Sequence, residues 1–218
     1  MPTIPGTEFG DEIYGGTAAD TIYAGGGGGG DEAYGGGGND TVDGGDGEDL
    51  LFGAEGHDTI SGGNDYDQIE GGAGDDVLFG GAGSDILQGR AGNDQAYGGE
   101  DNDDIRVLGG GNDFYYGGNG NDRFSMQPVD GLDSWLEGGG GADRFEDLGS
   151  KQAWITIADF NVNEGDKLLL NPLNEYEITA QADRIVFESN DGTVINLLAD
   201  AADFEEILLD GGVDYLIF

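Results

Sequence analysis

The chain has 218 residues, of which 47 are glycine and none is cysteine, and its formal net charge at pH 7 is −39. So many like charges repel one another, and so much glycine makes an ordered backbone entropically costly, which argues against an ordinary globular domain unless a cation compensates. A nucleic-acid partner is disfavoured because its phosphates would be repelled. Without cysteine there are no disulfides or thiolate metal sites, and no segment reaches the roughly 18 apolar residues that span a bilayer.

The N-terminus, residues 1–8, lacks the basic segment and apolar run of a Sec-type signal peptide. A nine-residue pattern then dominates the chain, and from Gly35 to Arg106 it recurs without a gap, as in GGGGNDTVD, GGDGEDLLF and GAEGHDTIS. The pattern is G-G-x-G-x-D-x-U-x, in which U is apolar. Its register slips before Gly26, at Val107 and again at Met126, after which a degenerate repeat carries Ser134 in place of the aspartate.

Two columns of residues follow from this repeat, one charged and one apolar. The eighth position is apolar or aromatic throughout, from Ile13 to Phe145. The sixth position is aspartate at Asp11, Asp20, Asp31, Asp40, Asp49, Asp58, Asp67, Asp76, Asp85, Asp94, Asp103, Asp113, Asp122 and Asp143. Six glycine-rich residues are expected to turn the chain and three, x-U-x, to form a short strand, so that two repeats make one coil and stacked coils bury U between two parallel sheets.

Consecutive repeats then turn on opposite edges, so the aspartates of every second repeat stack on one edge. One edge is expected to carry the series from Asp11 and Asp31 to Asp143, and the other the series from Asp20 and Asp40 to Asp113. Stacked turns that each offer a carboxylate and outward carbonyls supply the hard oxygen ligands of calcium, and the stack would hold at most about twelve ions. A solvated glycine-rich linker would have no reason to keep this spacing.

The nonapeptide is identified as the calcium-binding repeat of the RTX (repeats-in-toxin) or haemolysin-type family. The resemblance implies an all-β fold, a parallel β-roll over residues 6–146 built from about fifteen repeats, with a C-terminal β-sandwich-like capping segment. Residues 147–200 contain ADF-x₄-GDKL, which resembles the segment after the repeats in secreted RTX proteases and lipases. Acidic residues there often hold a further calcium ion in those relatives, so Asp159 and Asp166 are candidate ligands, with surface turn residues as the alternative.

The last segment, residues 201–218, ends in LLDGGVDYLIF and resembles the uncleaved C-terminal signal of type I secretion substrates. The alternative interpretation is a final strand of the cap, and the two are compatible. Together with the repeats and the lack of an N-terminal signal, this tail favours export by type I secretion machinery and a secreted, extracellular protein.

No enzymatic site can be assembled from the sequence. The single histidine, His57, falls at the variable fifth position of a repeat and is expected to be an exposed turn residue. There is no HExxH motif, nucleophile elbow or Ser/His/Asp set, and the regular array assigns the many carboxylates to calcium rather than to catalysis.

The outward strand positions carry two aromatic columns, which either reinforce the roll or form an interaction surface. One column is Tyr14, Tyr34 and Phe52, and the other, on the opposite sheet, is Phe79, Tyr97 and Tyr116. A threonine ladder of Thr21, Thr41 and Thr59 is expected on that second sheet; its single short column makes an ice-binding role the weakest hypothesis.

The N-terminal end has no cap, which leaves strand edges and a half-built calcium site open to a neighbour. The first hypothesis is therefore a non-enzymatic, secreted calcium-binding protein that folds on extracellular calcium and self-assembles as a homopolymer into filaments or surface layers. The alternative is a folding, secretion and substrate-binding module of a larger exported enzyme or adhesin.

Overall fold

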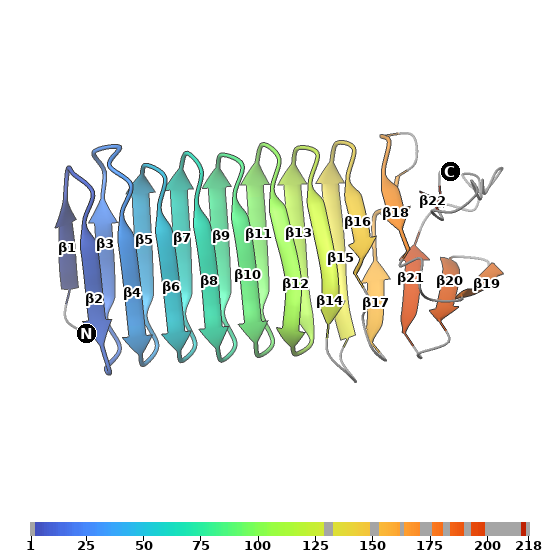
Figure 1. Ribbon diagram of the computed structural model, residues 1–218, viewed down its shortest axis with the longest axis horizontal. Helices are drawn as coiled ribbons and strands as arrows, with labels where there is room; N and C mark the ends of the chain where they lie inside the picture. Colours follow the sequence, from blue (N-terminus) through green and yellow to red (C-terminus); the bar gives the residue numbers. More distant parts are fainter. Residues whose placement is uncertain are drawn as a thin grey trace.

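The chain forms a flattened rod of two β-sheets, in which the strands β1 to β18 lie alternately in the two layers and pair in parallel with their repeat neighbours, while β19, β20 and β22 pair antiparallel at the C-terminal end (Figure 1). The computed structural model describes residues 3–128, 133–148, 153–161, 164–170, 176–180, 184–189, 193–198 and 215–216. One sheet has 12 strands and the other 10. The described residues include no helix long and apolar enough to cross a membrane. The predicted all-β parallel roll is confirmed.

The 12-stranded sheet, here called sheet A, contains in spatial order β1 (Thr3–Thr7), β3 (Thr21–Gly25), β5 (Thr41–Asp46), β7 (Thr59–Asn64), β9 (Val77–Ala82), β11 (Gln95–Glu100), β13 (Asp113–Asn119), β15 (Asp133–Gly140), β17 (Trp154–Ile157), β21 (Val194–Leu198), β20 (Arg184–Ser189) and β19 (Tyr176–Ala180). Sheet B contains β2 (Glu12–Gly16), β4 (Glu32–Gly37), β6 (Leu50–Glu55), β8 (Gln68–Ala73), β10 (Ile86–Ala91), β12 (Asp104–Gly110), β14 (Arg123–Pro128), β16 (Arg144–Asp147), β18 (Lys167–Leu169) and β22 (Tyr215–Leu216).

The eighth-position side chains form the core between the two sheets. Each repeat strand pairs in parallel with the strand two ahead of it, so Leu51 lies beside Ile69 in sheet B and Ile60 beside Leu78 in sheet A. All four are at most 2% exposed. Toward the C-terminal end the core becomes aromatic. Phe124 and Phe145 stack there with ring centroids 4.7 Å apart. The apolar column therefore packs as the repeat predicts.

The expectation of three-residue strands is wrong, because the strands continue into the next repeat. In β5 the strand includes the glycine pair of the following repeat, and the turn is reduced to residues 47–49. The second glycine of the pair needs a backbone that disfavours side chains. Gly45 has φ +104°, and a Cβ there would lie 1.7 Å from the carbonyl oxygen of Gly25. The two glycines thus extend the sheets instead of belonging to the turn.

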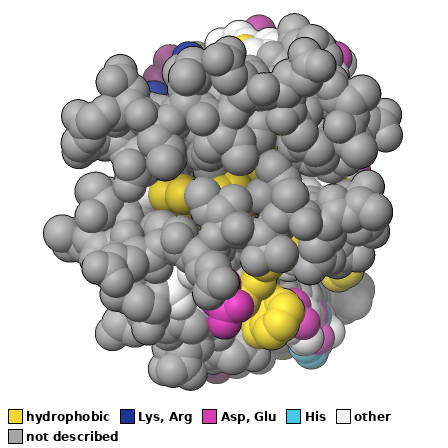
Figure 2. Space-filling model, turned by 90° about the vertical axis from the view of Figure 1, so that its right-hand side faces the viewer, with side chains coloured by type: hydrophobic (Ala, Val, Ile, Leu, Met, Phe, Trp, Pro, Cys, Tyr) yellow, Lys and Arg dark blue, Asp and Glu magenta, His cyan; other side chains and the backbone are white. Residues whose placement is uncertain are grey.

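The described strands after residue 147 continue both sheets. β17 pairs with β15 in parallel and carries β21 on its far side, whereas β18 pairs with β16. Seen from this end, hydrophobic side chains of described residues are visible near the middle of the molecule (Figure 2). Nearly all of the secretion-signal-like tail, residues 201–218, lies outside the described residues, which include only 215–216 of it.

The outward faces carry the predicted columns. Tyr14, Tyr34 and Phe52 stack on sheet B with centroids 5.0 and 4.8 Å apart. Phe79, Tyr97 and Tyr116 stack on sheet A with centroids 5.2 and 5.0 Å apart. The threonine ladder is also confirmed, since Thr41 in β5 is in register with Thr21 and Thr59. Rings within a column cover one another's faces.

Candidate metal centre

The sixth-position aspartates form two ladders, one along each edge of the roll, as the repeat predicts. In each ladder the backbone N–H of one aspartate donates to Oδ1 of the aspartate in the next stacked turn, at 2.6–3.0 Å. The first edge carries Asp11, Asp31, Asp49, Asp67, Asp85, Asp103, Asp122 and Asp143. The second edge carries Asp20, Asp40, Asp58, Asp76, Asp94 and Asp113.

The second oxygen of most of these carboxylates is buried and has no hydrogen-bond partner in the described part of the chain. The aspartates from Asp20 to Asp143 in the two ladders are each at most 4% exposed, so the side chains point into the roll. A buried carboxylate oxygen that lacks a donor is costly unless a cation compensates it. The unpartnered Oδ2 atoms are those of Asp40, Asp49, Asp58, Asp67, Asp76, Asp85, Asp94, Asp103, Asp122 and Asp143.

The first glycine of each repeat leaves the space into which this oxygen points. A Cβ on Gly44 would lie 2.4 Å from Oδ2 of Asp49 and 2.6 Å from the carbonyl oxygen of Gly62. The two oxygens, from coils that are stacked on each other, therefore border one cradle that only a missing side chain keeps open. The same pair of oxygens lies within 3.0 Å at Gly6, Gly15, Gly35, Gly44, Gly53, Gly62, Gly71, Gly80, Gly98 and Gly117.

The cradles fit a hard cation whose ligands are one carboxylate per turn and backbone carbonyls. No three His, Cys, Asp or Glu side chains converge on a metal-sized site among the described residues, so the remaining ligands must come from the main chain. All the available donors are oxygens and their turns are glycine-rich, which suits the flexible coordination of Ca²⁺ better than the strict octahedron of Mg²⁺. Bound calcium would supply the positive charge that the buried carboxylates lack.

Without a cation, burial makes these carboxyl groups weak acids. Desolvation, assisted by the neighbouring aspartates of the ladder, raises the pKa of Asp67 and Asp103 to about 8, from an ordinary value of 3.8. The same causes raise the pKa of Asp76 and Asp143 to about 7. The cost of burying negative charge is therefore greatest in the middle and C-terminal parts of the ladders.

The second edge loses its cradles toward the C-terminal end. Where other repeats have the first glycine, β12 and β14 carry Val107 and Met126, which are register partners and at most 1% exposed. A bulge between β10 and β12 accommodates the extra residue at Val107. In the next turn Ser134 replaces the aspartate, and its buried hydroxyl has no partner. Apolar side chains thus fill this stretch of the second edge.

Asp166 and Asp159 both lie at the C-terminal end of the first edge. Oδ1 of Asp166 accepts the backbone N–H of Asp143 at 2.9 Å, so Asp166 extends the ladder by one turn. The carboxylate of Asp159 accepts the N–H groups of Gly138 and Gly139 at 2.8 and 2.7 Å. Both carboxylates contribute to raising the pKa of Asp143, since like charges disfavour its ionised form. The two candidate residues therefore converge on the last turn of the column.

A further ladder at the fifth position was not predicted from the sequence. His57 Nδ1 accepts the backbone N–H of Asp75 at 2.8 Å, and the His57 N–H donates to Oδ1 of Asn39 at 3.1 Å. Asn93 and Asn112 continue the series. His57 is an exposed turn residue as expected, but its ring nitrogen also joins two turns. The recurrence of Asn, His and Asp at this position is the signal that could have revealed the ladder.

Comparison with known proteins agrees with this geometry. The RTX calcium-binding nonapeptide repeat, represented by a four-copy family model, matches residues 5–27, 25–60, 52–87, 79–110 and 107–124. No curated protein matches the chain. The family matches cover residues 5–124, more than half of the chain, and include both aspartate ladders as far as Asp122. The chain therefore belongs to the RTX family of calcium-binding nonapeptide repeat proteins.

Proposed function

We propose that this chain is a secreted, non-enzymatic protein that rolls up on binding extracellular calcium and then serves as a structural unit. The observation that carries the proposal is the set of ten buried Oδ2 atoms in the aspartate ladders that have no hydrogen-bond partner among the described residues. The ions would lie in the glycine cradles, with the sixth-position aspartates as ligands, and Asp159 and Asp166 would complete a last site on the first edge.

The coupling of folding to calcium follows from charge. A chain of net charge −39 that must bury unpaired carboxylates gains little from rolling up alone. Ions that bind only the rolled chain stabilise it by mass action. Scarce cytosolic calcium would leave the chain expanded for type I export, and millimolar calcium outside would fold it.

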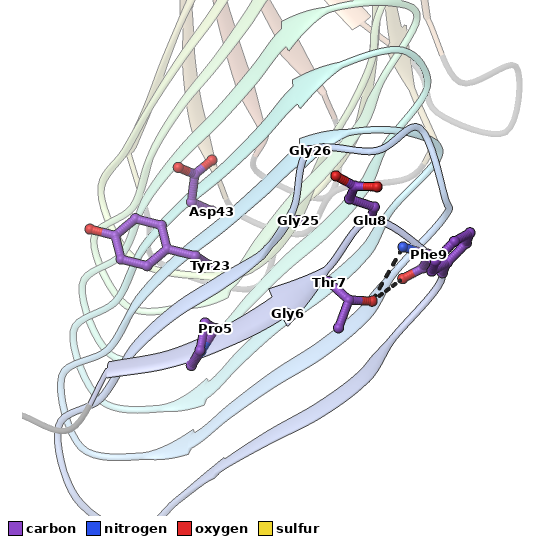
Figure 3. Close-up of a pocket in the computed structure, with 9 residues that line it drawn as sticks. All are labelled: Pro5, Gly6, Thr7, Glu8, Phe9, Tyr23, Gly25, Gly26 and Asp43. Carbon is purple, nitrogen blue, oxygen red and sulfur yellow. Dashed lines mark hydrogen bonds between the residues drawn. The ribbon is translucent and has the colours of Figure 1, made fainter.

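The N-terminal end is where we expect copies to meet. β1 and β2 are the edge strands of their sheets, and an open cavity of about 580 Å³ lies beside them, lined in part by Pro5, Phe9 and Tyr23 (Figure 3). The Phe9 side chain is 76% exposed, and Oδ1 of Asp20 is buried without a hydrogen-bond partner among residues 3–128 and the other described segments. Strand edges with unsatisfied groups favour pairing with another chain. A second copy stacked here would extend both sheets.

The same open edges also support the alternative function. A preceding segment of a longer exported enzyme or adhesin could cover β1 and β2 as well as a second copy could, and the roll would then be a folding and binding module. The calcium sites are identical in both cases. The oligomeric state of this chain in calcium separates the two.

The deciding experiment is size-exclusion chromatography with light scattering, first in chelator and then in millimolar calcium. We expect an expanded monomer in chelator and compact particles that grow with protein concentration in calcium. Phe9→Ser should weaken growth, whereas Phe79→Ser, on an aromatic column in the middle of sheet A, should not. A compact monomer at all concentrations would support the module and contradict assembly. A chain that is equally compact in chelator would contradict the proposal as a whole.

A further inference from the structure

A groove crosses the outer face of sheet A near its C-terminal end, beside Asp113, the last aspartate of the second edge. It has a volume of about 460 Å³ and is lined by residues of β13, β15, β17 and β21, which lie side by side in that order, and by Asn112 just before β13. Phe114, Trp135, Thr156 and Asn196 form one row across these four strands. A volume of this size is typical of a small-molecule site.

The aromatic rings of the groove differ from those of the two stacked columns. Phe114 is 44% and Trp154 55% exposed, and Trp135 is partly exposed between them. No ring–ring contact among the described residues involves any of the three, so their faces are not covered by another ring. Trp135 and Trp154 are also the only tryptophans of the chain. Unstacked faces of large rings are available to a ligand with an apolar surface.

Polar groups stand beside these rings in the same groove. Asp133 precedes Trp135 by two residues and lies in register with Trp154, and Thr156 is in register with Trp135. Trp135 itself is held in place, because its Nε1–H donates to Oε1 of Glu137 at 2.9 Å. A carboxylate, a hydroxyl and the amides of Asn112 and Asn196 therefore surround the fixed ring. Such groups hydrogen-bond to hydroxyls, while rings stack on the C–H face of a sugar.

The charge of the chain narrows the class of ligand. Among the described residues no Lys or Arg lines the groove, which carries Asp113 and Asp133 instead, and the net charge of −39 repels anions. The four strands span about 14 Å, three inter-strand spacings, which suits a short chain of rings. We infer that this groove binds a neutral oligosaccharide, whose sugar faces stack on Phe114, Trp135 and Trp154 and whose hydroxyls bond to Asp133 and the amides. This site goes beyond the proposed function.

Intrinsic tryptophan fluorescence is a direct readout, because both tryptophans lie in the groove. The calcium-loaded full chain is titrated with three neutral hexasaccharides, made of β-1,4-linked glucose, α-1,4-linked glucose and β-1,4-linked N-acetylglucosamine, and with hexagalacturonate as the acidic counterpart. Calorimetry follows the same titrations. At least one neutral hexasaccharide should shift the emission and release heat with saturation, and hexagalacturonate should do neither.

Two variants locate the binding. Trp154→Ala should weaken the binding of the neutral hexasaccharide about tenfold or more, because a stacking ring is lost. Tyr14→Ala, which removes a similarly exposed ring on sheet B, should leave the affinity unchanged. Circular dichroism in calcium is the control that checks whether both variants remain rolled. Calcium-dependent compaction should be unaffected by Trp154→Ala. The inference about the groove and the proposed calcium function can therefore be contradicted independently.

The inference is overturned if none of the neutral hexasaccharides binds at millimolar concentration, or if Trp154→Ala binds as tightly as the parent chain. Preference for hexagalacturonate would also overturn it. Choline is included as a cationic probe, since aromatic rings beside a carboxylate can hold an organic cation. Binding of choline without binding of any saccharide would reassign the groove to cations.

Discussion

At the scale of single residues, the first glycine of the repeat defines the calcium site as much as the aspartate does. Gly62 lies in β7 and has an ordinary strand backbone, so its lack of a side chain is not needed for the turn. A Cβ there would lie 2.2 Å from Oδ2 of Asp67 and 2.8 Å from the carbonyl oxygen of Gly80. The glycine therefore keeps these two oxygens uncovered, so that both can face one ion in the proposed site.

Gly62→Ala should remove one calcium ion and lower the free energy of unfolding in calcium by about 1–3 kcal/mol, as expected for overpacking a closed space. Calcium stoichiometry by calorimetry and equilibrium unfolding measure the two effects. Gly26→Ala is the matched control, because a Cβ at Gly26 meets nothing within 4 Å. Equal effects of the two substitutions would contradict the role given to the cradle.

The contributions of individual residues were only partly predictable from the sequence. The aspartate and apolar columns could be assigned because charge and hydropathy alternate with the repeat, and the two edges followed from counting turns. The function of Gly62 could not be assigned, since glycine in a turn and glycine above a carboxylate look the same in a sequence. Asp166 could be placed only by a resemblance, because its spacing of 23 residues from Asp143 departs from the 18 residues of two repeats.

At the scale of elements, the two edges of the roll differ in what joins their turns. The first edge keeps its aspartate ladder from Asp11 to Asp166. The second edge changes at β12 and β14, where Val107 and Met126 replace the first glycine. The sequence signalled this change as slips of the repeat register, but register alone does not show whether an insertion bulges outward or fills the cradle. Burial of both side chains shows that they fill it.

Restoring the repeat at Ser134 should therefore not restore a site. Ser134→Asp would bury a carboxylate beside apolar side chains, and we expect a loss of about 1–3 kcal/mol in the free energy of unfolding with no additional calcium bound. Ser134→Ala removes a buried hydroxyl without a partner and should be neutral or slightly stabilising. Equilibrium unfolding in saturating calcium measures the free energy of unfolding of both variants, and calorimetry counts the calcium ions that each one binds. If Ser134→Asp bound one additional calcium ion, the Met126 side chain would have to move out of the cradle, and the prediction would be wrong.

At the scale of the whole molecule, the proposed calcium sites imply that protons and calcium ions compete for the same carboxylates. Burial raises the pKa of Asp67, Asp76, Asp103 and Asp143 to about 7–8 in the ion-free roll, above the ordinary 3.8. Because the folded pKa is the higher one, protonation stabilises the ion-free roll fully below pH 3.8. That stabilisation is lost as the pH rises through about 7–8.

In chelator, the chain should thus be more compact at pH about 5.5 than at pH about 8.5, and the calcium concentration needed to complete folding should rise with the pH, since protons already stabilise the ion-free roll at the lower pH. Circular dichroism and hydrodynamic radius across a pH series measure both trends. Added salt at pH about 8.5 is the control for general repulsion. If salt alone produced the same compaction, or if the pH had no effect, burial of the ladder carboxylates would not govern folding.

The stacked rings on the outer faces make the rolled state visible to light. Tyr14 and Tyr34 are tilted by only 4° at a centroid distance of 5.0 Å, and Tyr97 and Tyr116 by 3° at the same distance. Parallel chromophores this close couple their electronic transitions, and each pair joins residues 19 or 20 positions apart in the chain. A near-ultraviolet dichroic band from these pairs can exist only where one coil rests on the next. Coil stacking can consequently be followed by near-ultraviolet dichroism without an added label. The Tyr14–Tyr34 pair reports on the beginning of the rod, and the Tyr97–Tyr116 pair reports on a part further along it.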